Sequence, residues 1–126
     1  METAYSYKKS AAYQKSKQLT LDVVSFFKGK ELRGILKYLV NQLVRAISSE
    51  GANLAEGYGR YYSQDYRRFI SISRGSAFEV DYWLEIIIEL NLFPRKRLDE
   101  FSEQNLEIIK LLTTMMKRLE VKKSKT

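Results

Sequence analysis

The sequence predicts an all-α protein that folds as an antiparallel, up-down-up-down bundle of four helices. Apolar residues recur at three- and four-residue steps through most of the chain, which is the period of an amphipathic helix. Glycine and proline are sparse, and the connections between the periodic segments are short, which makes consecutive helices antiparallel. At 126 residues the chain is expected to form a single domain with one core. We expect order over about 7–121, followed by a basic tail at 122–126.

The first helix is expected to run from residue 7 or 10 to residue 28, and the second over about 34–56. Gly29 and Gly34 bracket the turn between them. The helical spacing assigns core positions to Ala12, Leu19, Val23 and Phe26 in the first helix and to Leu36, Leu39, Leu43, Ile47 and Leu54 in the second.

Gly57 and Gly59 are expected to end the second helix, because a residue without Cβ takes the left-handed backbone that stops a helix and reverses the chain. Ser63 is expected to cap the third helix with its side-chain oxygen. That helix then runs from 63 to 90 and is about 40 Å long. Its core face has a heptad-like spacing and steps through Phe69, Ile72, Ser76, Val80, Trp83, Ile87 and Leu90.

The third helix is expected to end at 91–94, because proline disfavours helical geometry in the residue before it. Pro94 is well suited to begin the fourth helix. Polar Asn105 interrupts the apolar positions of that helix, which are Leu98, Phe101, Ile108, Leu112, Met115 and Leu119. We expect the last residues, 122–126, to be disordered.

The composition removes several classes of function. The sequence has no cysteine and no histidine, so disulfides, thiol nucleophiles, the usual zinc ligands and the commonest general base are missing. It also has no Gly-rich phosphate loop, nucleophile–base pair or dinucleotide fingerprint. The longest apolar runs have three residues and the N-terminus lacks a secretory pattern. We therefore expect a cytoplasmic protein without a membrane span.

Acidic residues in the second half of the third helix raise the question of carboxylate chemistry. They are Glu79, Asp81, Glu85 and Glu89. A carboxylate di-metal site in a four-helix bundle usually adds Glu-x-x-His motifs, which a chain without histidine lacks. We expect a face that is solvated or meets basic residues of another subunit, and a protein that is not an enzyme and has no metal or cofactor.

Positive charge is concentrated beside tyrosines. The net charge is +7, and four arginines but only one acid lie between Tyr58 and Arg74. Arginine donates bidentately to phosphate, and tyrosine rings stack on unpaired bases, so this region is the candidate nucleic-acid-binding surface. The candidate residues are Arg60, Tyr61, Tyr62, Arg67, Arg68 and Arg74, with Tyr58 and Tyr66 beside them, and Lys8, Lys9, Lys122 and Lys123 near the termini. The alternative is that these charges only solubilise the surface.

A second set of polar residues falls where the second and third helices are expected to meet. Its members are Arg45, Asn53, Glu56, Ser76 and Glu79. An antiparallel register brings Arg45 near Glu79, and Glu56 near 65–68. These residues either fix the register through ion pairs or line an exposed groove that binds a ligand.

Two further features of this hairpin are open to interpretation. Asn53 is expected to form a hydrogen bond across the bundle or to cap a backbone carbonyl. The small residues Gly75-Ser76-Ala77 indicate either a close approach of two helices or a contact between subunits.

Several of these segments resemble one small bacterial family, the four-helix-bundle proteins encoded in intervening sequences of 23S ribosomal RNA genes. The accessory variability proteins of diversity-generating retroelements are relatives of that family. The resemblance covers roughly 13–119, and its most specific part is the Asn-x-Ala-Glu-Gly segment. The matching residues are Gln42-Leu43-Val44-Arg45, Asn53-Leu54-Ala55-Glu56-Gly57, Arg60, Arg68-Phe69 and Gly75-Ser76-Ala77-Phe78-Glu79.

The resemblance implies a ring-like homopentamer. It also implies that a basic ring binds nucleic acid and, in the retroelement relatives, a reverse transcriptase. Together with the residues, it favours a non-catalytic protein that binds structured RNA or an RNA/DNA hybrid. The alternative is a protein–protein scaffold ring whose positive charge has no role toward nucleic acid.

Overall fold

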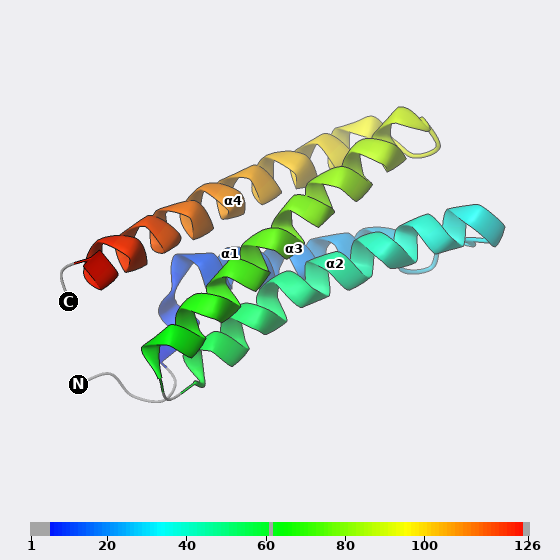
Figure 1. Cartoon of the computed structure of the whole chain (residues 1–126). Helices are drawn as coiled ribbons and strands as arrows, with labels where there is room; N and C mark the ends of the chain where they lie inside the picture. Colours follow the sequence, from blue (N-terminus) through cyan, green and yellow to red (C-terminus); the bar gives the residue numbers. More distant parts are fainter. Residues whose placement is uncertain (1–5, 61, 125–126) are drawn as a thin grey trace.

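Four long α-helices make up most of the computed structural model, which describes residues 6–60 and 62–124 (Figure 1). A short 3-10 turn, η1 (Ser6–Lys9), precedes them. The helices are α1 (Ala11–Phe27), α2 (Gly34–Tyr58), α3 (Ser63–Glu89) and α4 (Arg95–Ser124). No strand occurs among the described residues, and the predicted all-α class is confirmed.

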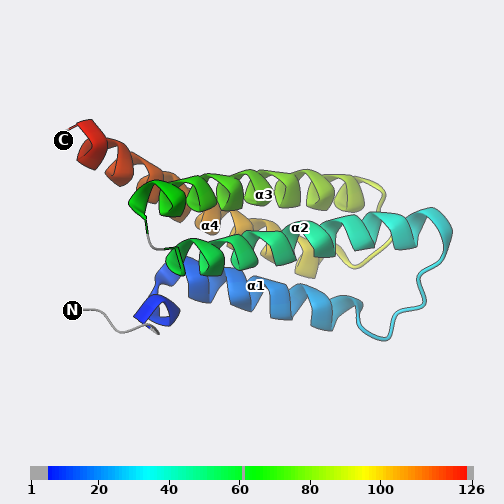
Figure 2. The ribbon, with the colours of Figure 1, turned by 60° about the horizontal axis from the view of Figure 1, so that its bottom comes forward.

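The helices pack as an antiparallel bundle in which each helix has two main neighbours. Helix α1 packs against α2 and α4, and α3 packs against the same two helices. The start of α1, the end of α2, the start of α3 and the end of α4 lie together (Figures 1 and 2). We call this the α2–α3 end. The opposite end carries the connections from α1 to α2 and from α3 to α4.

Apolar side chains from all four helices form one continuous core. Fully buried large side chains include Leu19 of α1, Leu43 of α2, Leu84 of α3 and Phe101 of α4. The predicted core positions hold for most of α1, α2 and α4, although Phe26, Leu36, Leu39, Met115 and Leu119 are only partly buried.

The predicted core face of α3 is partly wrong. Ile72 is 42% exposed, Leu90 is also exposed, and Ser76 and Trp83 are only partly buried. The buried positions are Phe69, Ile70, Ser73, Ala77, Val80, Leu84 and Ile87. The small residues Ser73 and Ala77 occupy part of the buried face of α3, whereas large apolar residues such as Ile72 lie beside it. A prediction that follows the spacing of large apolar residues therefore selects a neighbouring face of the helix.

The turns agree with the predicted boundaries but not always with the predicted cause. Gly29 and Gly34 have φ of 81° and 58°, a region that favours glycine. Gly57, however, is helical and Gly59 has φ of −81°, so neither takes the left-handed backbone that we expected. Gly57 instead permits a close approach, because a Cβ built there would lie 2.9 Å from Phe69 Cβ.

Two helix ends also differ from the expectation. The residue at the N-cap position of α3 is Tyr62, whose side chain makes no capping hydrogen bond, and Ser63 is the first helical residue. Helix α4 continues to Ser124, where we expected a disordered tail from Lys122, and 125–126 lie outside the described residues. Lysine is a good helix former and is favoured near a helix C-terminus, which accounts for the extra turn.

Candidate nucleic-acid interface

The predicted arginines cluster at the α2–α3 end, but they differ in their contacts. Arg60 Nη2 lies 3.1 Å from Glu56 Oε1, and its guanidinium lies 4.7 Å from the centre of the Phe69 ring. Arg74 Nε donates to Thr113 Oγ1 at 2.9 Å, and its guanidinium packs over Phe78. These two arginines are therefore held by neighbouring side chains.

Arg67 and Arg68 are less constrained. Arg68 is exposed and stands 5.2 Å from the centre of the Phe69 ring, and Arg67 is half-buried. Neither guanidinium has a hydrogen bond or ion pair to any residue in 6–60 and 62–124. Their donors are available to an external anion.

Tyrosines from four elements, η1, α1, α2 and α3, pack together at the same end of the bundle. The ring centres of Tyr7 and Tyr58 are 5.6 Å apart, and those of Tyr58 and Tyr66 are 5.3 Å apart. Tyr13 meets Tyr7 edge-on at 5.2 Å. This tyrosine cluster ties η1 and the start of α1 to the α2–α3 hairpin.

The other predicted binding residues are placed less completely. Tyr62 is exposed at the start of α3, and Lys8 and Lys9 are exposed in η1. Tyr61 lies outside the described residues. Lys122 and Lys123 belong to the last turn of α4, but their side chains are outside the described part of the chain.

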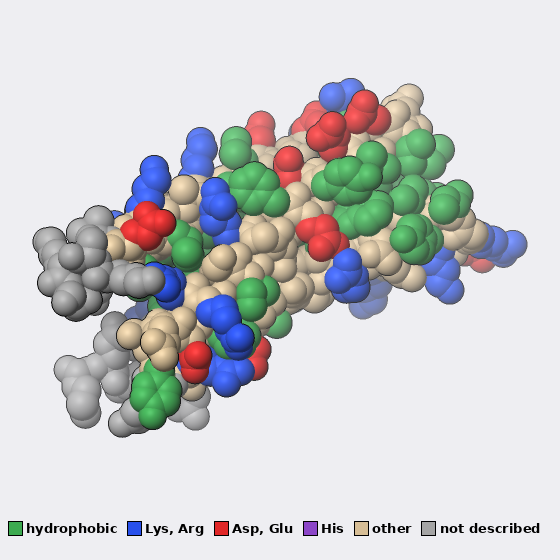
Figure 3. All heavy atoms as spheres, viewed as in Figure 1, with side chains coloured by type: hydrophobic (Ala, Val, Ile, Leu, Met, Phe, Trp, Pro, Cys, Tyr) green, Lys and Arg blue, Asp and Glu red, His purple; other side chains and the backbone are tan. Residues whose placement is uncertain are grey.

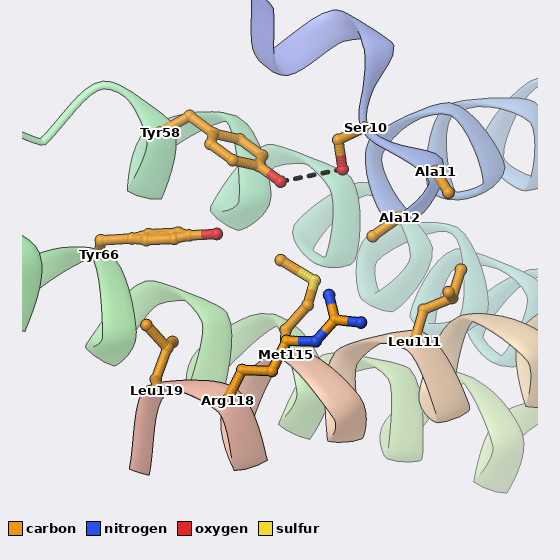
Figure 4. Close-up of a pocket in the computed structure, with 9 residues that line it drawn as sticks. All are labelled: Ser10, Ala11, Ala12, Tyr58, Tyr66, Leu111, Met115, Arg118 and Leu119. Atoms are coloured by element: carbon orange, nitrogen blue, oxygen red, sulfur yellow. Dashed lines mark hydrogen bonds between the residues drawn. The ribbon is translucent and has the colours of Figure 1, made fainter. Parts of the chain in front are cut away.

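A pocket of about 590 Å³ opens at the same end, where all four helices meet (Figure 4). Tyr58 and Tyr66 form one wall, and the Tyr58 hydroxyl donates to Ser10 Oγ at 2.9 Å. The remaining lining residues are Ala11, Ala12, Leu111, Met115, Arg118 and Leu119. Sequence reasoning missed this pocket, because its residues are scattered over the chain and only their packing brings them together.

Basic and acidic side chains both occur along the bundle, but acidic ones gather at one place. Figure 3 shows several lysine and arginine side chains over the α2–α3 end, at the left, with a few acidic ones among them, and a group of acidic side chains along the upper right edge. The acidic groove between α3 and α4 is lined by Asp81, Glu85, Ile88, Glu89, Arg95, Asp99 and Ser102. No group of three or more residues able to hold a metal ion is found in the described part of the chain.

The polar residues between α2 and α3 form a continuous seam. Arg45 Nη2 lies 2.6 Å from Glu79 Oε2, so the expected proximity of these residues is confirmed. Trp83 Nε1 donates to the same carboxylate oxygen at 3.1 Å. Glu56, by contrast, pairs with Arg60 rather than with 65–68.

Small polar side chains continue this seam toward the α2–α3 end. The Ser49 and Ser76 hydroxyls are 3.0 Å apart, and Asn53 Nδ2 donates to Ser49 O at 2.8 Å. Asn53 thus caps a carbonyl of its own helix, one of the two expected roles. Within the small-residue run 75–77, Ser76 contacts α2 and Ala77 is buried, so the expected helix approach is found there, whereas a Cβ added at Gly75 would meet nothing within 4 Å.

The core contains a polar layer that the sequence analysis mostly missed. Each helix contributes one polar residue that is 0% exposed: Ser16, Glu50, Ser73 and Asn105. Ser73 Oγ donates to the Glu50 carbonyl at 2.6 Å, and Asn105 Nδ2 donates to the Ala77 carbonyl at 2.9 Å. Ser16 Oγ, both Glu50 carboxyl oxygens and Asn105 Oδ1 have no hydrogen-bond partner among the described residues.

Glu50 is the most unusual member of this layer. Burial away from water raises the pKa of its carboxyl from 4.5 to about 8. The Ser16 hydroxyl lies near this carboxyl and opposes the rise only in part, because the two groups do not meet in good hydrogen-bond geometry. The signal was present in the sequence, since Glu50 continues the core spacing of Leu43, Ile47 and Leu54.

Fold and surface together define a small, basic four-helix-bundle protein in which two unpaired arginines, a tyrosine cluster and a pocket share one end. The chain belongs to the 23S rRNA-intervening sequence protein family, whose model matches residues 8–114. No curated protein matches the sequence. Among the described residues no helix is both long and apolar enough to cross a membrane.

A solved structure has the same fold. It is the crystal structure of a protein of unknown function from the S23 ribosomal protein family of Bacteroides thetaiotaomicron. The two chains are 25% identical and superpose with a TM-score of 0.74, over 85% of this chain and 99% of that one.

Proposed function

We propose that the protein is a non-catalytic, cytoplasmic, homo-oligomeric factor that binds structured RNA or an RNA/DNA hybrid through the α2–α3 end. The observation that carries the proposal is the pair of unpaired arginines, Arg67 and Arg68, beside the tyrosine cluster. Arginine is suited to planar, bidentate contacts with phosphate, and tyrosine supplies a stacking surface for unpaired bases.

The surrounding side chains support the same proposal. Lys8 and Lys9 add positive charge in η1. Arg60 forms an ion pair with Glu56, which lowers the negative potential near Arg67 and Arg68. The family name connects related proteins with 23S ribosomal RNA genes. A role beside a ribosomal RNA element and a role as accessory factor to a reverse transcriptase are both compatible with such a surface.

The test is RNA binding by fluorescence anisotropy over a salt series. An Arg67→Gln/Arg68→Gln variant should lose affinity, and the slope of log affinity against log salt should become shallower by about 1.4 to 1.8, since each phosphate contact contributes about 0.7 on a single strand and about 0.9 on a duplex. The matched control is Lys28→Gln/Lys96→Gln, which removes two exposed cations at the opposite end. If both variants behave like the wild type, or if the wild type does not bind at low salt, the proposal is wrong.

A second candidate function is a scaffold that docks a partner protein. Large apolar side chains such as Ile35, Tyr82 and Leu92 are exposed on α2, on α3 and in the loop after α3, and exposed apolar patches mark interaction sites. Binding through such a surface depends weakly on salt, whereas phosphate contacts give a steep log-linear dependence. The salt series therefore separates the two functions.

A further inference from the structure

We infer that the pocket at the α2–α3 end holds one unpaired nucleobase of the bound RNA. The inference rests on the proposed function and specifies it, because it states which part of an RNA the site selects. It requires an apolar space large enough for an aromatic ring, hydrogen-bonding groups at its edge, and a phosphate-binding arginine nearby.

The pocket has the size and lining of a site for a small aromatic group. Its volume of about 590 Å³ lies within the usual range for small-molecule sites. The aliphatic lining comes from α1 and α4, with Ala12, Leu111 and Leu119 among its residues, and the facing wall is Tyr58 and Tyr66 (Figure 4). A base that enters leaves water and packs between carbon-rich walls.

Polar groups stand at the edge of this apolar space. The Tyr66 hydroxyl points into it, and the Arg118 side chain extends across it from α4 (Figure 4). The Arg118 guanidinium has no hydrogen bond or ion pair to a described residue. Guanidinium groups only donate, and the edge of a nucleobase offers carbonyl and ring-nitrogen acceptors.

The pocket adjoins one of the proposed phosphate-binding residues in the chain. Tyr66, in its wall, directly precedes Arg67 in α3, so the phosphates of a nucleotide in the pocket would be within reach of Arg67. Bases in a duplex are paired and stacked, whereas those of loops and bulges are free to leave the stack. The site should therefore distinguish unpaired from paired RNA.

The test compares an RNA hairpin that has an unpaired loop with a fully paired duplex of equal length. Ala11→Trp fills the pocket from an exposed lining position, and Ala52→Trp, an exposed alanine in the groove between α1 and α2, is the matched control. We expect Ala11→Trp to weaken hairpin binding about tenfold, as loss of one stacked base does, and to leave duplex affinity and the hairpin's salt slope unchanged. A hairpin with 2-aminopurine in its loop should change fluorescence on binding wild type but not Ala11→Trp.

The outcomes separate this inference from the proposed function. If the wild type binds RNA but Ala11→Trp binds the hairpin as tightly as wild type does, the pocket holds no base and the proposed function stands. Equal weakening of hairpin and duplex also overturns the inference, since the pocket then does not read unpaired bases. Absence of any RNA binding by the wild type overturns both. A variant that fails to fold would be recognised by circular dichroism, and Arg118→Gln, which changes only an exposed side chain, then takes its place.

Discussion

Glu50 is a carboxyl group inside the core with no hydrogen-bond partner for either oxygen among the described residues. An ionised carboxylate in such a place is costly, and the group avoids this cost by keeping its proton. The folded protein holds the proton up to about pH 8, where the pKa of Glu50 lies, whereas the unfolded chain releases it near the ordinary value of 4.5. At any pH between about 4.5 and 8, unfolding therefore releases a proton from Glu50. The contribution of Glu50 to the free energy of unfolding falls as the pH rises through this range and is constant above about pH 8.

Glu50→Gln tests this account, because glutamine resembles the protonated acid and does not titrate. Between about pH 5 and 8, deprotonation linked to Glu50 should lower the free energy of unfolding of the wild type by about 1.4 kcal/mol for each pH unit. The variant should lack that loss and become the more stable protein toward pH 8. Urea unfolding at pH 5.5, 6.5, 7.5 and 8.5 measures both profiles.

The control for this prediction is Glu103→Gln, which removes an exposed carboxylate from α4. It should keep the pH slope of the wild type. Parallel profiles for wild type and Glu50→Gln would show that the Glu50 carboxyl gains water or a partner, and would contradict the prediction.

The pairing of α2 with α3 is the most extensive helix contact in the bundle. Two kinds of contact set its geometry. Near one end, Gly57 lets Phe69 approach the α2 backbone, and farther along the polar seam joins Arg45 to Glu79. The ion pair is largely exposed, and exposed pairs contribute at most about 1 kcal/mol, so we attribute the close pairing mainly to the glycine.

Gly57→Ala should destabilise the protein, because the added Cβ meets Phe69 Cβ and forces the helices apart. Overpacking of this kind costs about 1–3 kcal/mol, which outweighs the gain in helix propensity of up to about 1 kcal/mol. Gly75→Ala is a matched control in the middle of α3, where an added Cβ meets nothing within 4 Å. That variant should be more stable than the wild type. Urea midpoints measure both changes, and a shift of the same sign in the two variants would contradict the explanation.

Sequence reasoning at the level of elements succeeded where periodicity is strong. The four helices and their order follow from the three- and four-residue spacing, and the antiparallel register correctly brought Arg45 to Glu79. It failed on α3, because Ser73 and Ala77 are small and do not mark the inward face as large apolar residues do.

Prediction of the site had a similar limit. The concentration of arginine and tyrosine between 58 and 74 was readable from the sequence, since neighbours in a helix stay neighbours in space. The pocket was not, because it needs the start of α1 and the end of α4 to meet the α2–α3 turn. Which arginines are free also depends on tertiary contacts, as the bond from Arg74 to Thr113 shows.

At the scale of the whole molecule, α3 has an exposed apolar stripe that the bundle leaves uncovered. Ile72, Phe78 and Tyr82 lie on this outward side, with exposed Gly75 between them. Figure 3 shows hydrophobic side chains gathered over the part of α3 that adjoins the start of α2. A second copy of the chain is the partner that we propose for this stripe, in line with the ring implied by the resemblance. Small residues such as Gly75 permit close packing there.

Phe78→Glu/Tyr82→Glu should convert the proposed oligomer to a monomer, because two carboxylates would be buried without partners in each contact. Leu21→Glu is the control, since Leu21 is 51% exposed on α1 and Phe78 is 49% exposed on α3. Sedimentation measures the mass of each protein, and circular dichroism should show that all of them remain helical.

The monomeric variant should also bind RNA at least about tenfold more weakly, because a ring presents several linked copies of the arginine pair to one RNA and gains affinity from effective concentration. A wild type that sediments as a monomer would refute the oligomer, and a monomeric variant with unchanged RNA affinity would mean that each bundle binds RNA independently.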